Sequence, residues 1–287
     1  MRILVTGAGG MLGQDVVRAA VAAGHEPIGL DRRALDVTDR ELVQRAVANA
    51  GPNAVINCAA WTDVDGAESS PGEADAVNGA GAGHVAQATA EAGALLVHVS
   101  TDYVFDGTSI SPYTESAPTS PISAYGATKL AGEDAVARAG TEHVIVRSSW
   151  LFGAGGGNFV QTMLRLGDER ESVAVVTDQT GCPTWTVHLA HALIELAASD
   201  RRGVLHVAGD GACSWNEFAV EIFAQAGLSC RVEPATTEEM ARPAARPANS
   251  VLRSERVAPE LPHWRDGLAG YLAARRDTVA PAAKVSP

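Results

Sequence analysis

The sequence is poor in cysteine, and its few cysteines lie far apart. Cys58, Cys182, Cys213 and Cys230 are the only ones in 287 residues, and they show neither the spacing of metal ligands nor a CxxC pair. We therefore expect reduced thiols in a cytoplasmic protein. A signal peptide is not expected, because Arg2 is followed at once by a strand pattern and a glycine turn.

Positive charge and long hydrophobic runs are also scarce. Lys and Arg number 22 against 34 Asp and Glu, which gives a formal net charge of −12, and no dense Lys/Arg block occurs. This balance argues against nucleic acid as a partner. No apolar run reaches the roughly 18 residues of a membrane-spanning helix, so no membrane partner is expected either. Hydrophobic residues still make up 46% of the chain, which is ample for a globular core.

Strand and helix patterns alternate along the first half of the chain. Short apolar runs predict strands over residues 2–7, 26–31, 53–60, 94–100 and 143–150. Between them, longer patterns predict helices over residues 11–24, 40–51, 74–93 and 123–140. This alternation is typical of an α/β fold, in which a parallel sheet is covered by helices on both faces.

A glycine-rich turn follows the first predicted strand. In "GAGGMLG", Gly7, Gly10 and Gly13 have G-x-x-G-x-x-G spacing, with Met11 and Leu12 between the last two. Glycines let the backbone approach a pyrophosphate, whose charge then lies at the N-terminus of the following helix. Because the turn joins a strand to a helix, it predicts a dinucleotide-binding site that includes these five residues.

The end of the second predicted strand leaves the choice of cofactor open. Asp31 stands where an acidic residue can bind the adenosine ribose hydroxyls, which favours NADH. Arg32 and Arg33 follow directly and could instead hold the 2′-phosphate of NADPH. Asp36 and Val37 are expected near the adenine.

A tyrosine and a lysine stand four residues apart in "YGATK" (125–129). On a helix, Tyr125 and Lys129 would share one face. An ammonium group near a phenol lowers the phenol pKa. Such a pair can exchange a proton with a substrate oxygen near neutral pH, although five residues alone would also suit a simple packing pair.

Taken together, these motifs resemble a known family. The glycine turn, "STDYVFDG" (100–107) and "YGATK" are similar to motifs of the extended short-chain dehydrogenase/reductases. Further blocks resemble the dTDP-4-dehydrorhamnose reductases and occur in that family's order: "INCAAWTDVDGAE" (56–68), "RSSWLFG" (147–153), "NFVQTMLRL" (158–166), "TDQTGCPT" (177–184) and "RPANSVL" (246–252). The resemblance runs from residue 1 to about residue 275.

The resemblance implies a doubly wound, Rossmann-type NAD(P)-binding domain over residues 1–150. The strand and helix near 186–209 would return to that domain, and 151–287 would form mainly a smaller substrate-binding lobe. A disordered tail is expected from about residue 276.

The resemblance also implies an activity, the reduction of the C4 keto group of dTDP-4-dehydro-L-rhamnose by NADPH or NADH. Tyr125 would protonate the C4 oxygen, Lys129 would bind the nicotinamide ribose and lower the pKa of Tyr125, and Thr101 would hydrogen-bond the same oxygen. The remaining expected contacts are Ala59, Ala60 and Trp61 to the cofactor, Asp102 and Trp150 to the sugar or its nucleotide, and Arg246 and Asn249 to the diphosphate. Trp150 could equally be a core aromatic.

Some members of that family bind magnesium at a dimer contact, which leaves a homodimer open. Asp15 matches one of the magnesium positions. The segment "TVHLAHALIELA" (186–197) offers no clear partner carboxylate, so the sequence supplies only one ligand for a metal.

Other functions share this fold. A 4,6-dehydratase would need an acidic pair after Thr101, but Asp102 is followed by Tyr103; an epimerase is a further alternative. A non-catalytic subunit, such as the regulatory β subunit of methionine adenosyltransferase, would be free to lose Tyr125 or Lys129, and this chain keeps both. A ketoreductase that acts on a related dTDP-4-keto-6-deoxyhexose in secondary metabolism stays open.

Overall fold

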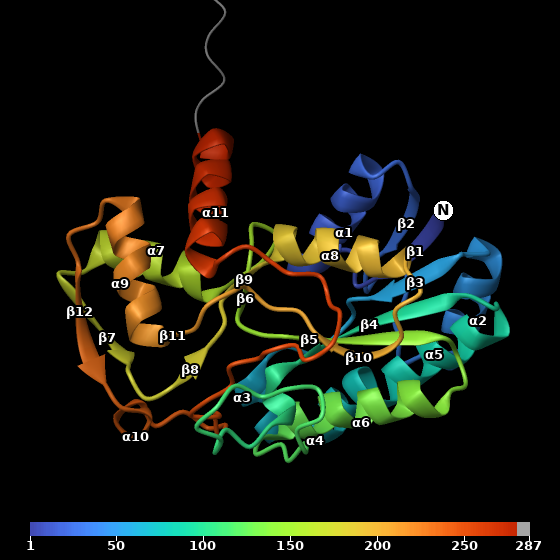
Figure 1. The fold of residues 1–287 in the computed structure, drawn as a ribbon, viewed down its shortest axis with the longest axis horizontal. Coiled ribbons are helices and arrows are strands. Elements are labelled where there is room, and N and C mark those ends of the chain that lie inside the picture. Colours follow the sequence, from blue (N-terminus) through green and yellow to red (C-terminus); the bar gives the residue numbers. More distant parts are fainter. Residues whose placement is uncertain (280–287) are drawn as a thin grey trace, which may run out of the picture.

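A six-stranded sheet forms the centre of the computed structural model, which describes residues 1–279 (Figure 1). The strand order is β10-β5-β4-β3-β1-β2, and every pairing is parallel. The strands are β1 (Arg2–Thr6), β2 (Glu26–Leu30), β3 (Ala54–Asn57), β4 (Leu95–Thr101), β5 (His143–Ser148) and β10 (Gly203–His206). The predicted α/β fold with a doubly wound parallel sheet is confirmed.

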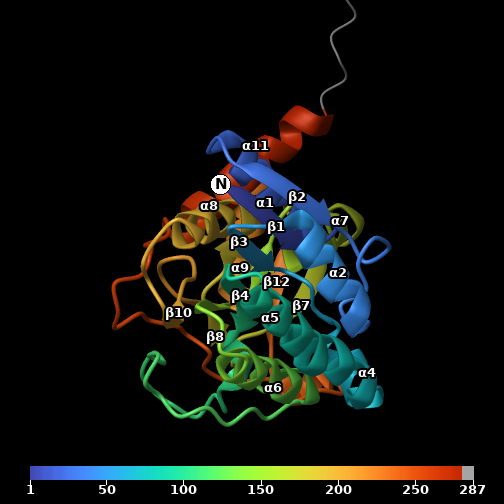
Figure 2. The same ribbon diagram turned by 90° about the vertical axis from the view of Figure 1, so that its right-hand side faces the viewer.

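Helices cover both faces of this sheet, as Figure 2 shows. On one face α1 (Met11–Ala22) packs beside α8 (Thr186–Ala197); on the other, α2 (Arg40–Ala50), α5 (Ala82–Glu91) and α6 (Ala124–Arg138) lie side by side. Side chains alternate along each strand, so Ile3 and Val5 join the core under α1 and α8, and Leu4 joins the opposite core. Burial on both faces explains why these strands read as continuous apolar runs.

The order in which the chain adds strands to the sheet reverses at β1. From β1 the chain crosses through α1 to β2 at one edge, and from β2 it crosses through α2 to β3 on the other side of β1. The carboxyl ends of β1 and β3 therefore mark a topological switch point, where open α/β sheets bind their ligands. Residues 7–10 and 58–61 leave the sheet there.

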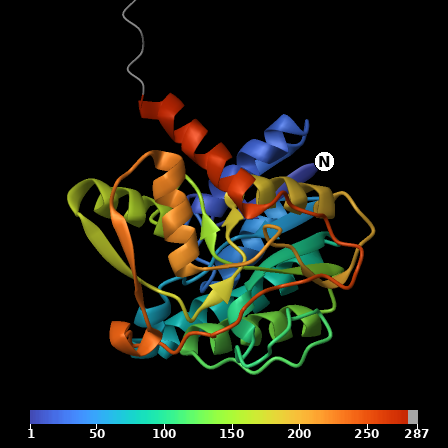
Figure 3. The same ribbon diagram turned by 60° about the vertical axis from the view of Figure 1, so that its left-hand side comes forward.

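A second hydrophobic core is built from C-terminal elements. It lies among α7 (Phe159–Glu169), α9 (Trp215–Ala226), α11 (Trp264–Val279) and the parallel pair β7 (Ser172–Val176) and β12 (Arg231–Ala235). Short strands link the parts: β6 (Leu151–Phe152) pairs with β9 (Thr184–Trp185), and β8 (Thr180–Gly181) pairs with β11 (Cys213–Ser214). In Figure 3 the orange-to-red segment before α11 passes back beside the six-stranded sheet.

Short helices complete the described residues: α3 (Val64–Ser69), α4 (Pro71–Asp75), the π-helical turn η1 (Ala76–Gly81), the 3₁₀ turn η2 (Asp102–Val104) and α10 (Thr237–Met240). The helix predicted over 74–93 thus contains a π-helical turn. Helix α11 continues to Val279, and the rest of the predicted tail, residues 280–287, lies outside the described residues. Within residues 1–279, no helix is long and apolar enough to cross a membrane. The thiols of Cys58, Cys182, Cys213 and Cys230 are unpaired.

Candidate active site

Two adjoining pockets open at the switch point and collect most of the predicted site residues. The inner pocket, about 580 Å³, is lined by Gly10, Met11, Leu12, Gly13, Ala60, Thr101, Asp102, Tyr125, Lys129 and Trp150 among others. The outer pocket, about 380 Å³, is lined by Gly7, Gly10, Asp31, Arg32, Asp36, Val37, Ala59, Ala60 and Trp61 among others. The pockets share Gly10, Cys58 and Ala60, so an extended ligand could occupy both.

The glycine turn leaves room for a ligand's phosphates between the two pockets. Gly7 has φ +65°, and a Cβ atom on it would lie 2.7 Å from the backbone nitrogen of Ala59. A Cβ atom on Gly13 would collide with the carbonyl oxygen of Gly7. Gly10 is the N-cap of α1 and offers no side-chain capping bond, so the first N–H groups of this helix are free to bind an anion. The turn therefore fits a pyrophosphate.

The outer pocket carries both of the predicted ribose-binding groups. Asp31 folds back on its own turn, where Oδ1 accepts hydrogen bonds from the backbone of Arg33 and Ala34, each 3.0 Å long. The side chains of Asp31, Arg32 and Arg33 are exposed at the rim of this pocket. A ribose hydroxyl or a 2′-phosphate could bind there, so both nicotinamide cofactors fit.

The start of α6 is held in place from two sides, which positions Tyr125. The backbone nitrogen of Ala124 donates to Oε1 of Glu68 on α3 at 2.8 Å. Gly126 packs so closely that a Cβ atom there would collide with the carbonyl oxygen of Tyr103. Tyr125 thereby enters the inner pocket next to the carboxyl end of β4.

Lys129 is a buried cation one helical turn after Tyr125. Its side chain is 2% exposed, and Nζ donates to the carbonyl oxygen of Val99 at 2.7 Å. Burial lowers the pKa of Lys129 to about 8, although the carboxylate of Glu133 and the thiol of Cys58 act in the opposite direction. The pKa of Lys129 therefore lies close to neutral pH.

The pKa of Tyr125 differs from the value expected from sequence. Burial raises the pKa of Tyr125 to about 12; a hydrogen bond from Thr101 opposes this rise, and the Asp102 carboxyl adds to it. The ammonium of Lys129 is directed at Val99 and does not lower the phenol pKa. The expected lowering was wrong, because burial dominates the pKa of this phenol and Lys129 is not among the groups that shift it.

Thr101 and Asp102 adjoin Tyr125 at the end of β4. The hydroxyl Oγ1 of Thr101 lies 3.0 Å from Oδ1 of Asp102 and accepts a 3.2 Å hydrogen bond from the backbone nitrogen of Tyr103. Asp102 is 1% exposed, and burial raises its pKa to about 6, although the hydroxyls of Ser250 and Thr101 act in the opposite direction. The inner pocket thus holds three groups that can exchange protons or hydrogen bonds with a substrate oxygen.

Several residues of the inner pocket were not singled out from sequence. The ring of Tyr103 packs edge-on to that of Tyr125, with centroids 5.5 Å apart. Trp215 stacks on Trp150, with centroids 3.5 Å apart and the rings 5° from parallel. Trp150 also has φ +49°, a strained backbone conformation that is often found at functional sites. Trp215 is the first residue of α9, and no local sequence pattern links it to the pocket. Tyr103 directly follows Thr101 and Asp102, so the sequence did contain a signal for it.

Arg246 and Asn249 lie outside both pockets and bind other parts of the protein. Nη2 of Arg246 contacts both carboxylate oxygens of Asp65 on α3, at 3.1 and 3.0 Å. Nδ2 of Asn249 donates to the carbonyl oxygen of Ser109 at 2.8 Å. Their predicted contact with a diphosphate stays a prediction, and it would require these protein contacts to be exchanged.

Asp15 does not fit a magnesium site. Its side chain is 4% exposed, and its two oxygens bind the Thr186 hydroxyl and the Arg18 guanidinium. A guanidinium already neutralises this carboxylate, and residues 1–279 contain no cluster of three or more His, Cys, Asp or Glu side chains suited to a metal.

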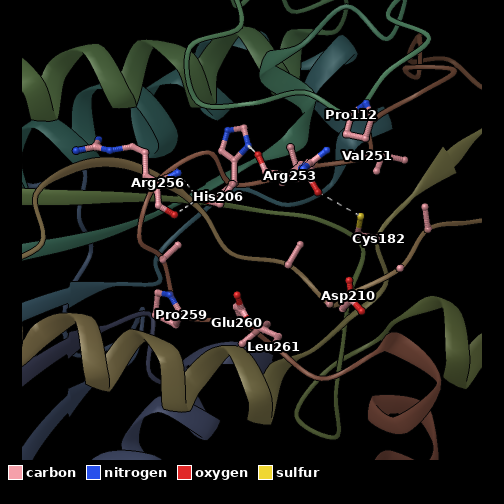
Figure 4. Close-up of a pocket in the computed structure, with 17 residues that line it drawn as sticks. Pro112, Cys182, His206, Asp210, Val251, Arg253, Arg256, Pro259, Glu260 and Leu261 are labelled. Atoms are coloured by element: carbon pink, nitrogen blue, oxygen red, sulfur yellow. Dashed lines mark hydrogen bonds between the residues drawn. The ribbon is translucent and has the colours of Figure 1, made fainter.

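A separate cavity of about 560 Å³ lies between β10 and the segment that precedes α11 (Figure 4). Its lining includes His206, Asp210, Arg253 and Glu260, and none of the site residues predicted from sequence. Nδ1 of His206 contacts the carbonyl oxygens of Tyr113 and Arg253, at 3.1 and 3.2 Å, and Nε2 has no hydrogen-bond partner among residues 1–279. This cavity therefore has no link to the site predicted from sequence.

Comparisons with known proteins agree with this arrangement. The family model described as RmlD substrate binding domain matches residues 1–276. A dTDP-4-dehydrorhamnose reductase of Streptomyces griseus is 46% identical over 93% of this chain and 91% of that protein. A dTDP-4-keto-6-deoxy-D-glucose reductase of Streptomyces niveus is 43% identical, over 93% and 95% respectively. A crystal structure of the Bacillus anthracis dTDP-4-dehydrorhamnose reductase with NADP has a TM-score of 0.92 at 39% identity, covering 95% of this chain and 99% of that one.

Proposed function

The chain belongs to the RmlD substrate binding domain family, and we infer from this membership that it reduces the C4 keto group of dTDP-4-dehydro-L-rhamnose to give dTDP-L-rhamnose. It is an oxidoreductase that uses NADPH or NADH. One observation carries the assignment to this chain: Thr101, Tyr125 and Lys129 line a single pocket that adjoins the glycine turn.

In this proposal a reduced nicotinamide cofactor, when bound, supplies a hydride to C4. Tyr125 gives its phenolic proton to the C4 oxygen as that oxygen gains negative charge, which is general acid catalysis. Thr101 donates a hydrogen bond to the same oxygen. Lys129 binds the nicotinamide ribose with its ammonium, which burial already holds in one orientation against Val99.

We propose that the outer pocket holds the adenosine half of the cofactor, with Ala59, Ala60, Trp61, Asp36 and Val37 as its walls. Arg32 would bind the 2′-phosphate of NADPH, and Asp31 would bind the adenosine ribose hydroxyls of NADH. The matched test is Arg32→Ala beside Asp31→Ala. Arg32→Ala should raise the KM for NADPH more than that for NADH, and Asp31→Ala should do the reverse; equal changes for both cofactors would contradict these roles.

On the substrate side, we propose that Asp102 and Trp150 border the deoxysugar. The strained backbone of Trp150 and its stack on Trp215 support a recognition role over simple core packing. The nucleotide diphosphate would bind near the segment that contains Arg246 and Asn249. This requires Arg246 to exchange its contact with Asp65 for a phosphate, which suits its planar guanidinium.

We further propose that different parts of the chain bind the cofactor and the substrate. Residues 1–150 bind the cofactor together with α8 and β10, because β10 pairs with β5 and α8 packs on α1. The rest of 151–287 then serves mainly substrate binding. A cytoplasmic location and a homodimer are also proposed; the four unpaired thiols suit a reducing compartment. Light scattering on the purified protein would decide between monomer and dimer.

The direct test supplies dTDP-4-dehydro-6-deoxyglucose, a 3,5-epimerase and NADPH, and identifies the product by NMR. We expect dTDP-L-rhamnose to form only when the epimerase is present. No oxidation of NADPH under either condition would contradict the proposal.

One relative favours a second candidate substrate. Because the Streptomyces niveus protein is named a dTDP-4-keto-6-deoxy-D-glucose reductase, the un-epimerised sugar could be reduced directly. The same experiment without the epimerase separates the two. Rapid formation of a 6-deoxy-D-hexose product would favour this second candidate.

A further inference from the structure

Asp102 is a buried carboxyl group with one oxygen that has no partner. Its Oδ2 has no hydrogen-bond partner among residues 1–279, and its Oδ1 lies 3.0 Å from the hydroxyl of Thr101. The residue also lines the inner pocket. An ionised carboxylate with an unsatisfied oxygen is costly in a low-dielectric site, whereas a neutral carboxylic acid is much less so.

The hydrogen bonds around Thr101 can be counted. A threonine hydroxyl has one proton to donate and two lone pairs to accept. One lone pair accepts the backbone N–H of Tyr103. Only the proton and a single lone pair are left to serve Asp102, Tyr125 and any substrate oxygen.

The protonation state of Asp102 decides where the hydroxyl proton of Thr101 points. If Asp102 is ionised, it can only accept, so it takes that proton, and the last lone pair of Thr101 is free to accept the phenolic proton of Tyr125. Both protons are then directed into the protein. If Asp102 is protonated, it fills the last lone pair itself, and the protons of Thr101 and Tyr125 are both available to a substrate.

We propose that Asp102 works as a neutral carboxylic acid, which donates its proton to Oγ1 of Thr101 and so frees the Thr101 hydroxyl to bind the substrate keto oxygen. Asp102 is a positioning residue in this scheme, because it acts through Thr101. Its proton stays on the carboxyl group throughout, so nothing is transferred. The inference rests on the proposed reduction of a keto group at this site.

Burial of Asp102 favours its neutral form. It raises the pKa of Asp102 to about 6, although the hydroxyls of Ser250 and Thr101 and the backbone of Asp102 and Tyr103 act in the opposite direction. The titratable groups that face it are the phenols of Tyr103 and Tyr125 and the thiol of Cys182, and burial raises the pKa of each. Arg242 and Arg246 act on Tyr103 and are held by Asp65.

Asp102→Asn is the decisive variant, because an amide donates N–H to Thr101 as the neutral acid does but does not titrate. In the wild type, kcat should fall about tenfold per pH unit above the pKa of Asp102. Asp102→Asn should lose this limb, so that its kcat no longer falls between about pH 6 and about pH 8, whereas Asp102→Ala should lose at least about tenfold relative to Asp102→Asn at every pH. In a Thr101→Val background, Asp102→Asn should have no further effect. An unchanged limb in Asp102→Asn, or its inactivation while folded, would overturn the proposal.

An infrared titration gives a readout that does not need turnover. The difference spectrum of wild type minus Asp102→Asn should show the carbonyl stretch of a protonated carboxylic acid that disappears between about pH 5 and about pH 8. A carboxylate that stays ionised down to about pH 4 would refute the inference. If the wild type does not reduce the dTDP-sugar, the proposed function fails, but the infrared result still decides the protonation state of Asp102.

Discussion

Nζ of Lys129 donates a 2.7 Å hydrogen bond to the carbonyl oxygen of Val99, and this contact anchors α6 to β4 through a cation with a 2% exposed side chain. The ammonium is thus fixed beside the strand end that carries Thr101. Burial of this charge costs free energy, and for that reason the pKa of Lys129 is lowered to about 8. This buried cation therefore reduces the stability of the fold.

Lys129→Met should raise the free energy of unfolding near pH 7. The folded protein releases the lysine proton near pH 8, whereas an unfolded lysine releases it near pH ~10.4. Between these values the unfolded chain holds more protons, so wild-type stability rises with pH across this window. The gain in the variant should be on the order of 3 kcal/mol below about pH 8 and should shrink toward about pH 10.4. Urea denaturation at both ends of the window measures it.

Arg138→Met is the matched control, because Arg138 is an exposed cation on the same helix. Its effect on stability should not depend on pH across that window. A Lys129→Met variant that is less stable than the wild type at pH 7 would show that the contacts of the ammonium outweigh its burial.

Gly10→Val should abolish cofactor binding and leave the fold intact. A Cβ atom on Gly10 would lie 3.2 Å from the carbonyl oxygen of Gly7, and the rest of a valine would fill the junction of the two pockets. Isothermal titration with NADPH should show at least about a hundredfold loss of affinity, roughly 2.7 kcal/mol. Gly72→Ala is the control, since nothing lies within 4 Å of a Cβ atom there. Unchanged affinity in a folded Gly10→Val variant would contradict the assignment of the glycine turn.

The sequence could predict the sheet and the inner pocket because both depend on local patterns. Buried parallel strands are continuous apolar runs, and the glycine turn and the Tyr-Lys pair each consist of residues close together in the chain. The π-helical turn escaped prediction, since no local pattern marks it. It contains Asn78, whose side chain binds both backbone groups of Trp61, 17 residues earlier in the chain.

Contacts between distant segments escaped prediction for the same reason. The pairing of Arg246 with Asp65 joins residues 181 positions apart, and no spacing rule connects them. The stack of Trp150 on Trp215 is a second case. The pKa of Tyr125 was misjudged because burial, which sequence spacing does not reveal, dominates it.

Asp65→Asn should destabilise the protein near neutral pH and change substrate binding. Burial alone would raise the pKa of Asp65, but hydrogen bonds from Arg246, the Ala244 backbone and Arg242 hold it well below its usual range. A lowered carboxyl pKa contributes stability that is fully present above the unfolded pKa of ~3.9 and is lost as the pH falls toward the folded value. The variant should lose about 1–3 kcal/mol at pH 7 and much less in strong acid.

Urea denaturation at pH 7 and near pH ~2.5 tests this window. Glu73→Gln, an exposed carboxylate on α4, is the control and should change stability little at either pH. If Arg246 exchanges Asp65 for the substrate diphosphate, Asp65→Asn should also change the KM for the dTDP-sugar and leave the KM for NADPH unaltered. A changed KM for NADPH together with an unchanged KM for the dTDP-sugar would show that Arg246 does not bind the substrate.

Tyr125→Phe should abolish turnover and leave binding intact, because only the proton donor is removed. General acid catalysis contributes typically 10²–10⁴-fold, so kcat should fall by at least about a hundredfold while cofactor affinity is kept. Tyr271→Phe is the control: its hydroxyl lies in the second core without a hydrogen-bond partner among the described residues, so kcat should not change.

The pH profile distinguishes Tyr125 from Lys129. The pKa of Tyr125 is raised to about 12, so the phenol keeps its proton throughout the working range and should not produce the alkaline limb. Lys129, with a pKa of about 8, loses its charge within that range, so kcat/KM should fall as the pH rises through about 8. Because Asp102 gives a separate limb at lower pH, both variants are compared in an Asp102→Asn background. There, Tyr125→Phe should keep the limb near pH 8 at a lower rate, and Lys129→Met should lose it. A limb that vanishes in Tyr125→Phe and persists in Lys129→Met would assign the titrating group to the phenol instead.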